Sequence, residues 1–427
     1  MECPPEAPYL CGKKTLQRGL CVKESYECGT RISQKRSVPI LSAANSGLGA
    51  RYGYADADLG RSCYLDAAAV AANTDYDIRY EGGEPVPASF SFLTYNIWGL
   101  AKKEVNKHLF KLRKNLLVGT ILAADADLCF LQEMSQFAYG ELEEPLIGHY
   151  KYASERPFPA AGTPTPAERR RQVEVYCLSK YQPSRIRMIG IEGVLGYKNS
   201  LIIVEYPNLV VFNLYSQAGS RSSPGQEQKW LHYSRCRFDI LETIHDIMVR
   251  DYHGVRMVLC GDFNFDLDGS RADWPEIAML RKIKRQGFVD TFPHVNPSSP
   301  GYTEDTTNNV MRWNQKLIEK HYRFDAVLAK GLHPVASRLI GTEDEKLSPA
   351  DTDWFIEKIS ECGGDRTQLR GYDTATGQVK INPSDHYGVL TTFAPGPGPA
   401  SASSSKRSKS KSKSKSKSKS ASRKRRT

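Results

Sequence analysis

Four apolar or aromatic segments of this chain end abruptly in acid, amide or imidazole side chains. A buried strand delivers such groups to the edge of a sheet, where ligands bind. Hard oxygen ligands suit Mg²⁺ or Mn²⁺ better than zinc, which prefers histidine and cysteine. A hard cation beside a histidine and an aspartate is suited to the hydrolysis of a phosphate ester. The side chains that these segments offer are Asn96, Glu133, Asp262, Asn264, Asp385 and His386.

Asp262 and Asn264 are two residues apart, and in an extended backbone this spacing puts both side chains on one face. We then expect them to hold one water molecule, with Asp262 accepting its proton and Asn264 orienting the water or the phosphate. An Asp-x-Asn turn after a strand is the ordinary structural alternative. For Glu133 the ordinary alternative to a metal ligand is a solvated acid at the end of a strand. The spacing alone leaves these alternatives open.

The same segments contain four motifs that together resemble a known family. In chain order they are TYNIWG (94–99), LQE (131–133), GDFN (261–264) and SDH (384–386). This set resembles the endonuclease/exonuclease/phosphatase superfamily over residues 90–394. Within it, the likeness is to the 5′-tyrosyl-DNA phosphodiesterase branch, carried by GYTEDTTNN (301–309), RFDAVLA (323–329), RLIGTE (338–343) and NPSDHYGVL (382–390). The resemblance implies an α/β fold, a four-layer α/β/β/α sandwich with its site at one edge.

The resemblance also implies roles for the polar residues. Glu133 is expected to bind the metal, Asp385 to contact the metal or its water, and Asn96 to contact the metal, its ligand Glu133 or the phosphate. Asp325 lies inside an apolar segment and is expected to pair with His386, because a buried aspartate is costly unless paired. An imidazole oriented by an aspartate can donate to a phosphate oxygen and stabilise charge in the transition state. A purely structural His–Asp hydrogen bond is the alternative.

Tyr215 departs from the pattern that the resemblance implies. A histidine is expected at a strand end between the second and third motifs, and in residues 211–218 Tyr215 stands in its place. A phenol can donate a hydrogen bond to phosphate but stays neutral near pH 7. Tyr215 is therefore a candidate catalytic residue with weaker charge stabilisation. The alternatives are a different substrate, a weakened enzyme, or a tyrosine that only packs at the strand end.

Two further sets of residues have two interpretations each. Trp98, Tyr302 and Trp313 could stack on a base, although packing is the ordinary role of such rings. Residues 169–171 are three arginines that could contact phosphate, although a charged loop is the plainer interpretation.

Strands alternate with helices along the part of the chain that carries the motifs, which indicates a layered α/β body. Helical spacing of apolar residues is seen in 103–124, 226–250 and 274–286. Segments rich in Val, Ile, Phe and Tyr predict strands at 90–95, 128–132, 173–178, 200–206, 209–215, 256–260, 322–329 and 387–393.

The composition predicts four parts with different properties. They are a Cys-bearing segment (1–30), a poorly structured extension (31–88), the catalytic domain (89–394) and a disordered Lys/Ser-rich tail (395–427). The net charge is +11, but residues 406–427 hold twelve of the 59 basic residues and no acid. Residues 1–405 therefore carry 47 basic and 48 acidic residues, a net charge of −1. Attraction to polyanions is expected mainly from the tail.

Two features bear on the compartment. Cys3, Cys11, Cys21 and Cys28 lack a CxxC pair, so two disulfides or four reduced thiols are better interpretations than a zinc site. No secretory signal or membrane-spanning run is recognised. We expect an intracellular protein, in the cytoplasm or nucleus of a host cell or in a virion, because the basic tail and Cys-bearing head resemble proteins of large DNA viruses.

The sequence thus predicts a Mg²⁺- or Mn²⁺-dependent phosphodiesterase that acts on DNA or on 5′-linked DNA adducts. The expected partners are nucleic acid, at the tail and the active site, with a membrane surface as a further candidate, and the protein is expected to be a monomer. One alternative is a sphingomyelinase-like phospholipid phosphodiesterase, which TYNIWGL and NLYSQAG also resemble. The other is a catalytically weak protein that binds phosphate or nucleic acid.

Overall fold

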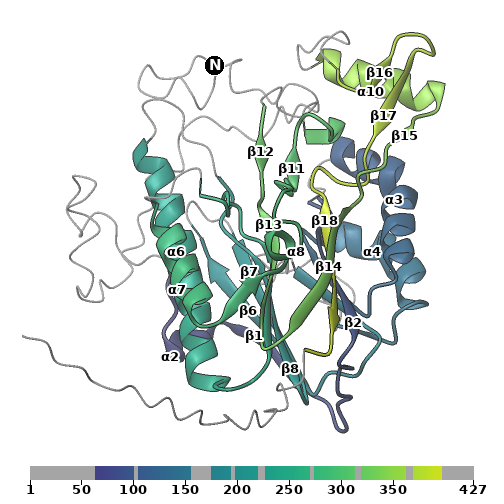
Figure 1. Ribbon diagram of the computed structural model, residues 1–427. Coiled ribbons are helices and arrows are strands. Elements are labelled where there is room, and N and C mark those ends of the chain that lie inside the picture. The colour runs from purple at the N-terminus through teal and green to yellow at the C-terminus, as the bar shows by residue number, and fades with distance from the viewer. Residues whose placement is uncertain are drawn as a thin grey trace, which may run out of the picture.

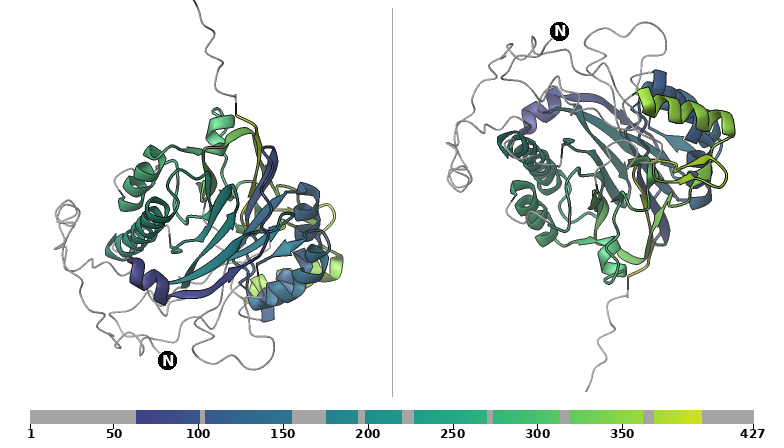
Figure 2. Two further views of the ribbon diagram at one scale, coloured as in Figure 1. Left: turned by 90° about the horizontal axis from the view of Figure 1, so that it is seen from below. Right: turned by 90° about the horizontal axis from the view of Figure 1, so that it is seen from above.

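The computed structural model describes residues 63–100, 104–154, 175–193, 198–219, 227–269, 274–312, 319–361 and 369–396. These residues form four layers, in which two β-sheets pack face to face between two layers of helices (Figure 1). Figure 2 shows α6 (Glu227–Asp251) and α7 (Pro275–Arg285) outside one sheet, and α3 (Glu104–Ala124) and α4 (Gln136–Ile147) outside the other. The expected α/β/β/α sandwich is confirmed.

The first sheet has seven strands in the order β1-β6-β7-β8-β9-β13-β10. β8 and β9 run parallel, and the other neighbours run antiparallel. Successive side chains alternate between faces, so Phe212 and Leu214 face α6 whereas Val211 and Tyr215 face the other sheet. The strands are β1 (Thr74–Arg79), β6 (Arg185–Glu192), β7 (Lys198–Tyr206), β8 (Leu209–Tyr215), β9 (Met257–Asp262), β13 (Asp325–Lys330) and β10 (Phe288–Asp290).

The second sheet has six strands in the order β14-β18-β2-β3-β5-β4. β2 and β3 are parallel and in register, with Asn96 opposite Gln132. The TYNIWG and LQE motifs, at the ends of β2 and β3, therefore lie at the same edge of this sheet. The strands are β14 (His333–Ile340), β18 (Gly388–Ala394), β2 (Phe90–Asn96), β3 (Leu128–Gln132), β5 (Val175–Ser179) and β4 (Tyr152–Ala153).

The core between the sheets is largely apolar, with a polar exception near the site. Phe92 and Phe130 stack there with ring centroids 5.1 Å apart, beside Val204 and Val258 of the facing sheet. The exception is a side-chain pair across the interface, in which Gln132 Nε2 donates to Asn213 Oδ1 at 2.7 Å. A buried amide pair of this kind fixes how the two sheets align, because either group alone would lose its partner.

A smaller apolar cluster lies outside the sandwich, beside the first turns of α3. Leu109 of α3 packs there with Met311, Phe355 and Val379, while Phe110 of the same helix faces the second sheet. Figure 1 shows the elements of this cluster gathered at one end of α3. They are α10 (Pro349–Glu361), β15 (Glu345–Lys346), β16 (Tyr372–Asp373) and β17 (Gln378–Ile381).

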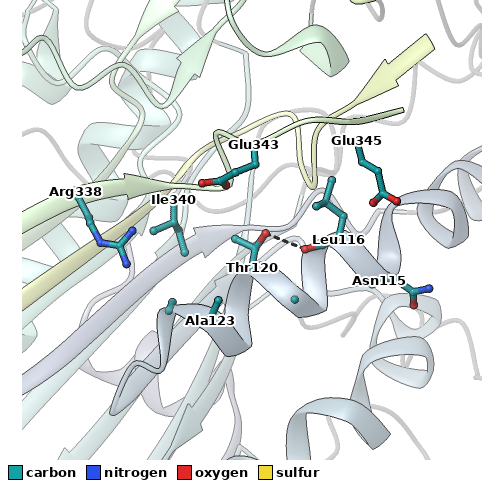
Figure 3. A pocket seen from close by; sticks show the side chains of 10 residues that line it. Asn115, Leu116, Thr120, Ala123, Arg338, Ile340, Glu343 and Glu345 are labelled. Carbon is teal, nitrogen blue, oxygen red and sulfur yellow. Dashed lines mark hydrogen bonds between the residues drawn. The ribbon is translucent and has the colours of Figure 1, made fainter. Parts of the chain in front are cut away.

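A groove with a volume of about 440 Å³ lies between α3 and the end of β14 (Figure 3). Leu116 and Thr120 line one side, and Ile340 and Glu343 line the other. None of the site residues predicted from the sequence lines this groove.

Residues 63–88 correct one expectation, since they belong to a segment predicted to be poorly structured. They contain α2 (Ala67–Ala72), which Asp66 caps by accepting from Ala69 N, and β1, which pairs with β6 at the sheet edge. Low apolar content was a poor guide here, because an edge strand needs few apolar side chains when its backbone bonds to a neighbour. The four-part division of the chain otherwise stays a prediction.

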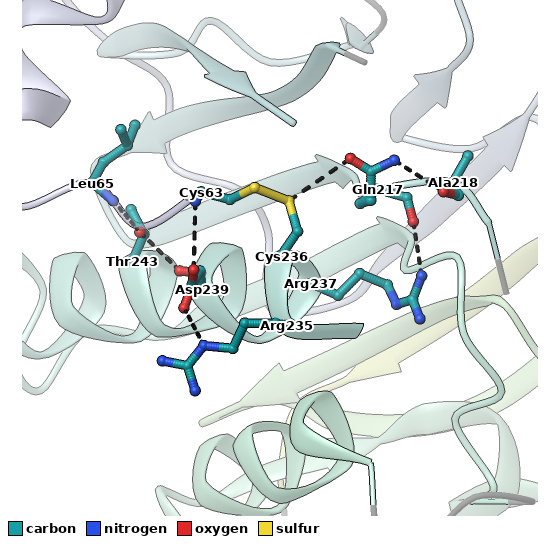
Figure 4. Close-up of a disulfide and its surroundings, with 9 residues drawn as sticks. All are labelled: Cys63, Leu65, Gln217, Ala218, Arg235, Cys236, Arg237, Asp239 and Thr243. Carbon is teal, nitrogen blue, oxygen red and sulfur yellow. Dashed lines mark hydrogen bonds and ion pairs between the residues drawn. A yellow bond between two sulfur atoms is a disulfide. The ribbon is translucent and has the colours of Figure 1, made fainter. Parts of the chain in front are cut away.

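A disulfide fixes this N-terminal segment to α6. Cys63 and Cys236 are bonded, with their Cα atoms 5.1 Å apart and a sequence separation of 173 residues (Figure 4). Nearby, Leu65 N donates to Thr243 Oγ1 at 2.9 Å. This bridge could not be predicted from the sequence, because neither cysteine belongs to a short-range pattern.

The remaining short elements are α8 (Thr291–Val295), β11 (Glu304–Asp305) and β12 (His321–Tyr322). The expected strands and helices are found within a few residues of their predicted bounds, whereas α4, α10, β6 and β14 were not predicted. The predictions for the four N-terminal cysteines, for residues 169–171, for Trp313 and for the basic tail lie outside the described residues. No helix in the described ranges has the length and apolar character needed to cross a membrane.

Candidate active site

The register of the first sheet brings three predicted residues into one cross-strand row. Tyr215 ends β8 opposite Asp262 at the end of β9, and Asp262 lies opposite Asp325 at the start of β13. All three are buried. In the second sheet, Asn96 ends β2, and Glu133 follows the last residue of β3. The site thus lies where the carboxyl ends of β2 and β3 in one sheet face the carboxyl ends of β8 and β9 in the other.

Asn96 joins the two sheets through its side-chain amide. Its Nδ2 donates to Asp262 Oδ2 at 2.9 Å and to Glu133 Oε1 at 3.2 Å. Its Oδ1 accepts from the backbone N–H of Trp98 at 2.9 Å. The structure therefore places Asn96 between the two acids, as a donor that holds both of them.

Glu133 occupies a strained turn after β3. Its φ is 58°, in the left-handed region that few residues other than glycine adopt. Gly99 is packed so closely against this turn that a Cβ atom there would lie 2.4 Å from the carbonyl oxygen of Glu133. The glycine of TYNIWG thus allows the first motif to approach the second. Strain of this kind is concentrated at functional sites.

Asp262 and Asn264 meet through a turn and not along an extended strand, which corrects the expected geometry. The φ of Asn264 is 57°, and its backbone N–H donates to Asp262 Oδ1 at 2.8 Å. Its side-chain Nδ2 donates to Ser216 O at 2.9 Å and to Asp262 Oδ2 at 3.2 Å. Gly261 is required just before, because its φ is 126° and a Cβ would lie 1.9 Å from Leu214 O.

His386 and Asp325 form the expected pair. His386 Nδ1 lies 2.7 Å from Asp325 Oδ2, and both side chains are buried. Asp325 Oδ1 has no hydrogen-bond partner among the described residues. Asp262, Asp325 and His386 each offer a ligand atom within 4.8 Å of the others, so the dyad lies directly beside Asp262.

Asp385 is held by an ion pair that the sequence did not predict. Arg312 Nη1 donates to Asp385 Oδ2 at 3.0 Å, and Arg312 Nε also pairs with Glu304. Lys320 Nζ lies 3.2 Å from the same Glu304 carboxylate. Asp385 Oδ1 is buried and has no partner among the described residues. The second oxygen of Asp385 is therefore available for a ligand.

Tyr215 contacts the proposed metal ligand directly. Its hydroxyl donates to Glu133 Oε1 at 3.0 Å, across the gap between the two sheets. The side chain is 5% exposed and packs among the apolar residues between the sheets. Its ring thus belongs to the core, and its hydroxyl belongs to the site.

Crowding of acids changes the pKa values in the cluster. Burial, together with the negative charge of Asp325, raises the pKa of Asp262 to about 8. Burial and then the charge of Asp385 raise the pKa of Glu133. Burial disfavours the charged form of His386, but the carboxylate of Asp325 outweighs it and holds the His386 pKa well above its ordinary value. A divalent cation would relieve this repulsion.

The donor set fits a hard divalent cation better than zinc. Glu133 and Asp385 supply carboxylate oxygens, and the partnerless Oδ1 of Asp385 is a buried acceptor that needs a positive partner. His386 is a poor ligand, because its protonated ring is already bonded to Asp325. Glu133 and Asp385 could therefore hold such a cation, and Asp262, Asp325 and His386, which lie close together, could serve proton transfer and charge stabilisation.

Two arginines near the site were missed by the sequence analysis. Arg312 lies 73 residues before its partner Asp385, and no local pattern distinguishes it from a solvated arginine. Arg113 lies inside α3, at a position where the helical pattern predicts only a polar face. A buried cation leaves no short-range signal in a single sequence, because its partners are defined by the fold.

Comparisons with known proteins gave a matching family model and several similar solved structures. A family model described as the Endonuclease/Exonuclease/phosphatase family matches residues 93–386. A D. rerio TDP2 structure, complexed with a single-strand DNA product, is 16% identical, covers 72% of this chain and 99% of its own, and has a TM-score of 0.45. A truncated TDP2 from Caenorhabditis elegans is also 16% identical, covers 72% and 97%, and has a TM-score of 0.44.

A beta toxin structure from Staphylococcus aureus is 14% identical, covers 71% of this chain and 99% of its own, and has a TM-score of 0.44. No curated protein matches the chain. The family model includes every predicted site residue from Asn96 to His386. With most of its length matched by that model, the chain belongs to the endonuclease/exonuclease/phosphatase family.

Proposed function

We propose that this chain is a divalent-metal-dependent phosphodiesterase that hydrolyses phosphate esters in DNA or in 5′-linked DNA adducts. The observation that carries the proposal is one buried cluster in which Glu133, Asp262 and Asp385 converge beside the dyad of His386 and Asp325. Membership of the family supports hydrolysis of phosphoric diesters.

Mg²⁺ or Mn²⁺ is the cofactor that the donor set favours. Glu133 and Asp385 would hold it, and Asn96 would keep Glu133 oriented through its 3.2 Å hydrogen bond. When bound, such an ion neutralises charge on the phosphate oxygens during displacement.

The protein's own side chains then divide the remaining work. Asp262, with its pKa raised to about 8, is matched to accept a proton from the attacking water near neutral pH. Asn264, held by Ser216 O, orients that water or the phosphate. His386, charged and fixed by Asp325, donates to a non-bridging phosphate oxygen and stabilises the pentacoordinate state.

DNA is the substrate that we favour, on three grounds. The C-terminal motifs resemble the 5′-tyrosyl-DNA phosphodiesterase branch, and the basic tail supplies a sequence-independent attraction to polyanions. The site also keeps every predicted hydrolytic group together, which counts against a protein that only binds phosphate. We further propose that the protein acts as a monomer in the cytoplasm or nucleus of a host cell, or in a virion.

A substrate panel tests the proposal. Purified protein would be incubated with a 5′-tyrosyl oligonucleotide, abasic duplex, single-stranded DNA and sphingomyelin, each with Mg²⁺, Mn²⁺ or EDTA. We expect hydrolysis of at least one DNA substrate, and its loss in EDTA. Hydrolysis of sphingomyelin alone would replace DNA by a phospholipid, and undiminished turnover in EDTA would contradict the metal-dependent mechanism.

Two substitutions test the assigned roles. Glu133→Gln and His386→Ala should each lower kcat by ~10²–10³, the usual cost of removing a preorganised charge stabiliser. Glu192→Gln, at an exposed position of β6, is the matched control and should turn over normally. A folded Glu133→Gln or His386→Ala enzyme with near-normal turnover would remove that residue from the mechanism.

A further inference from the structure

Arg113 of α3 is buried beneath the active site, where its guanidinium contacts two catalytic turns. The side chain is 1% exposed. Its Nη1 donates to Ile97 O at 2.8 Å and also to Pro383 O, while its Nη2 donates to Trp98 O. Ile97 and Trp98 follow Asn96, and Pro383 precedes Ser384, so one side chain joins segments about 285 residues apart in the chain.

This arginine is unusual because its hydrogen bonds go only to backbone carbonyls. Among the described residues, no carboxylate lies within ion-pair distance of it, and its Nε has no partner. Its guanidinium stacks on the rings of Trp98 and Phe110, at 5.0 Å and 4.7 Å from their centroids. Burying an unpaired cation is costly, so a charge kept here needs a reason.

The carboxylates of the site supply part of that reason. Burial lowers the pKa of Arg113 to about 10, and the charges of Asp385 and Glu133 act against this fall. Arg113 is therefore charged at neutral pH, and it is a fixed positive charge behind two acids that it does not touch. Burial on this scale also excludes a direct contact between Arg113 and substrate.

The first turn that Arg113 holds is strained, and the strain orients Asn96. Trp98 has a φ of 48°, in the left-handed region that a tryptophan rarely adopts. In this conformation its N–H donates to Asn96 Oδ1. Because the oxygen of the amide is occupied in this way, Nδ2 must face Asp262 and Glu133, as observed.

The second turn carries Asp385 and His386. Ser384 Oγ donates to Asn96 O at 2.7 Å, which ties this turn to the first. The carbonyl of Pro383 accepts from Arg113, immediately before that contact. Together the two links fix the backbone from which Asp385 and His386 extend.

We propose that Arg113 is a positioning residue that clamps the Asn96–Trp98 turn to the Pro383–His386 turn and thereby sets the relative placement of the proposed metal ligands and of His386. This inference rests on the proposed function for its kinetic consequences. Its structural content, the coupling of two turns by one buried guanidinium, can be measured without any substrate.

The test uses three variants of the full chain. Arg113→Met removes the charge and all its hydrogen bonds, and Arg113→Lys keeps the charge but lacks the planar fork of donors. Arg187→Met is the matched control, since Arg187 is a largely buried arginine on β6 that contacts Tyr252, outside the catalytic cluster. All three would be compared with the wild-type protein in folding, turnover and backbone exchange.

We expect Arg113→Met to lower kcat by ~100-fold with a change in KM below about threefold, because Arg113 orders catalytic groups and does not bind substrate. The kcat of Arg113→Lys should be about tenfold higher than that of Arg113→Met. The apparent Mg²⁺ requirement should rise in both variants. Arg187→Met should keep wild-type kcat even where its thermal stability falls.

Hydrogen–deuterium exchange gives the readout that does not depend on activity. In Arg113→Met, peptides covering residues 96–99 and 383–387 should both exchange faster, whereas Arg187→Met should leave both unchanged. If Arg113→Met does not fold, Arg113→Lys decides by the same measurements. Unchanged exchange in either segment, or a normal kcat in a folded variant, would overturn the inference. Absence of hydrolysis by the wild-type protein would instead contradict the proposed function and leave the exchange result to be judged by itself.

Discussion

At the scale of single residues, the site is dominated by acids placed closer together than they would be in water. Asp262 is held by Asn96 and Asn264, and it lies beside Asp325 and near Glu133. Hydrogen bonds from Asn96 and Asn264 to Asp262, and from the protonated imidazole of His386 to Asp325, partly offset the repulsion between these carboxylates. Such an arrangement stores electrostatic energy that a divalent cation and a phosphate would release on binding.

The pH dependence of stability should reveal this energy in the metal-free protein. Asp262 has a folded pKa of about 8 against an ordinary value of 3.8, so the folded state binds more protons than the unfolded state between these values. Stability should therefore fall as pH rises from 5 to 8, and the raised pKa of His386 acts in the same direction. Thermal melts in EDTA across this range would measure the slope.

The control for this prediction is Asp262→Asn, which removes the titrating group. Its melting temperature should vary less with pH over the same window, whatever its absolute stability. Added Mg²⁺ should raise the melting temperature of the wild-type protein more at pH 8 than at pH 5. A wild-type slope no steeper than that of Asp262→Asn would show that the folded pKa of Asp262 is not raised.

Tyr215 gives a second prediction at this scale. Tyr215→Phe removes the hydroxyl that donates to Glu133 at 3.0 Å. Because a hydrogen bond to a charged group contributes about 1.5–3 kcal/mol, we expect kcat to fall by about tenfold or more. Tyr215→His should retain activity if its imidazole takes over as a donor. A Phe variant with normal kinetics beside an inactive His variant would show that the phenol only packs.

At the scale of elements, the register in which the strands pair determines which residues meet at the site. Tyr215, Asp262 and Asp325 meet because β8, β9 and β13 pair with these residues directly opposite one another. A slip of one residue in any of these strands would turn its polar end to the other face of the sheet. The buried pair of Gln132 and Asn213 then holds the two sheets in a fixed alignment close to this row.

The disulfide is the element-scale feature with the clearest expected effect. Cys63→Ala should loosen the contact of residues 63–65 with α6 and lower the free energy of unfolding by about 2–4 kcal/mol, the usual effect of losing a bridge that closes a long loop. Chemical denaturation would measure the loss, and limited proteolysis should cut the variant first within residues 63–79. A reducing agent should weaken the wild-type protein and leave Cys63→Ala unchanged. Equal sensitivity of both to reduction would mean that this bridge is not formed in solution.

At the scale of the whole molecule, charge is distributed unevenly along the chain. Residues 1–405 carry a net charge of −1, and residues 406–427 carry twelve basic residues. Specific contacts in the site and general attraction to a polyanion are thus assigned to different parts of the protein.

Removal of the tail should separate these two contributions. A chain ending at Pro399 should bind long DNA more weakly, and the dependence of its affinity on salt should flatten, because fewer counterions are released. Turnover of a short substrate should barely change, since every proposed catalytic residue precedes the cut. Affinity would be measured against salt for both proteins. Equal slopes would show that residues 1–399 supply the phosphate contacts.

The sequence by itself determined the motifs, their order and most of the strands that carry them. This was sufficient for the family and for the layered α/β body, because a buried strand that ends in polar residues is a local pattern. Asn96, Glu133, Asp262, Asp325 and His386 all lie in the cluster where the sequence placed them.

Only the tertiary structure decided what depends on residues far apart in the chain. The bond between Cys63 and Cys236, the ion pair of Arg312 with Asp385 and the carbonyl contacts of Arg113 each join segments that share no local pattern. The sequence also left open whether Asp262 and Asn264 lie on an extended strand or in a turn, because a positive φ is fixed by the surrounding packing and not by the residue itself. The chemistry of the site is thus encoded locally, and its geometry is set by contacts that exist only once the two sheets have packed.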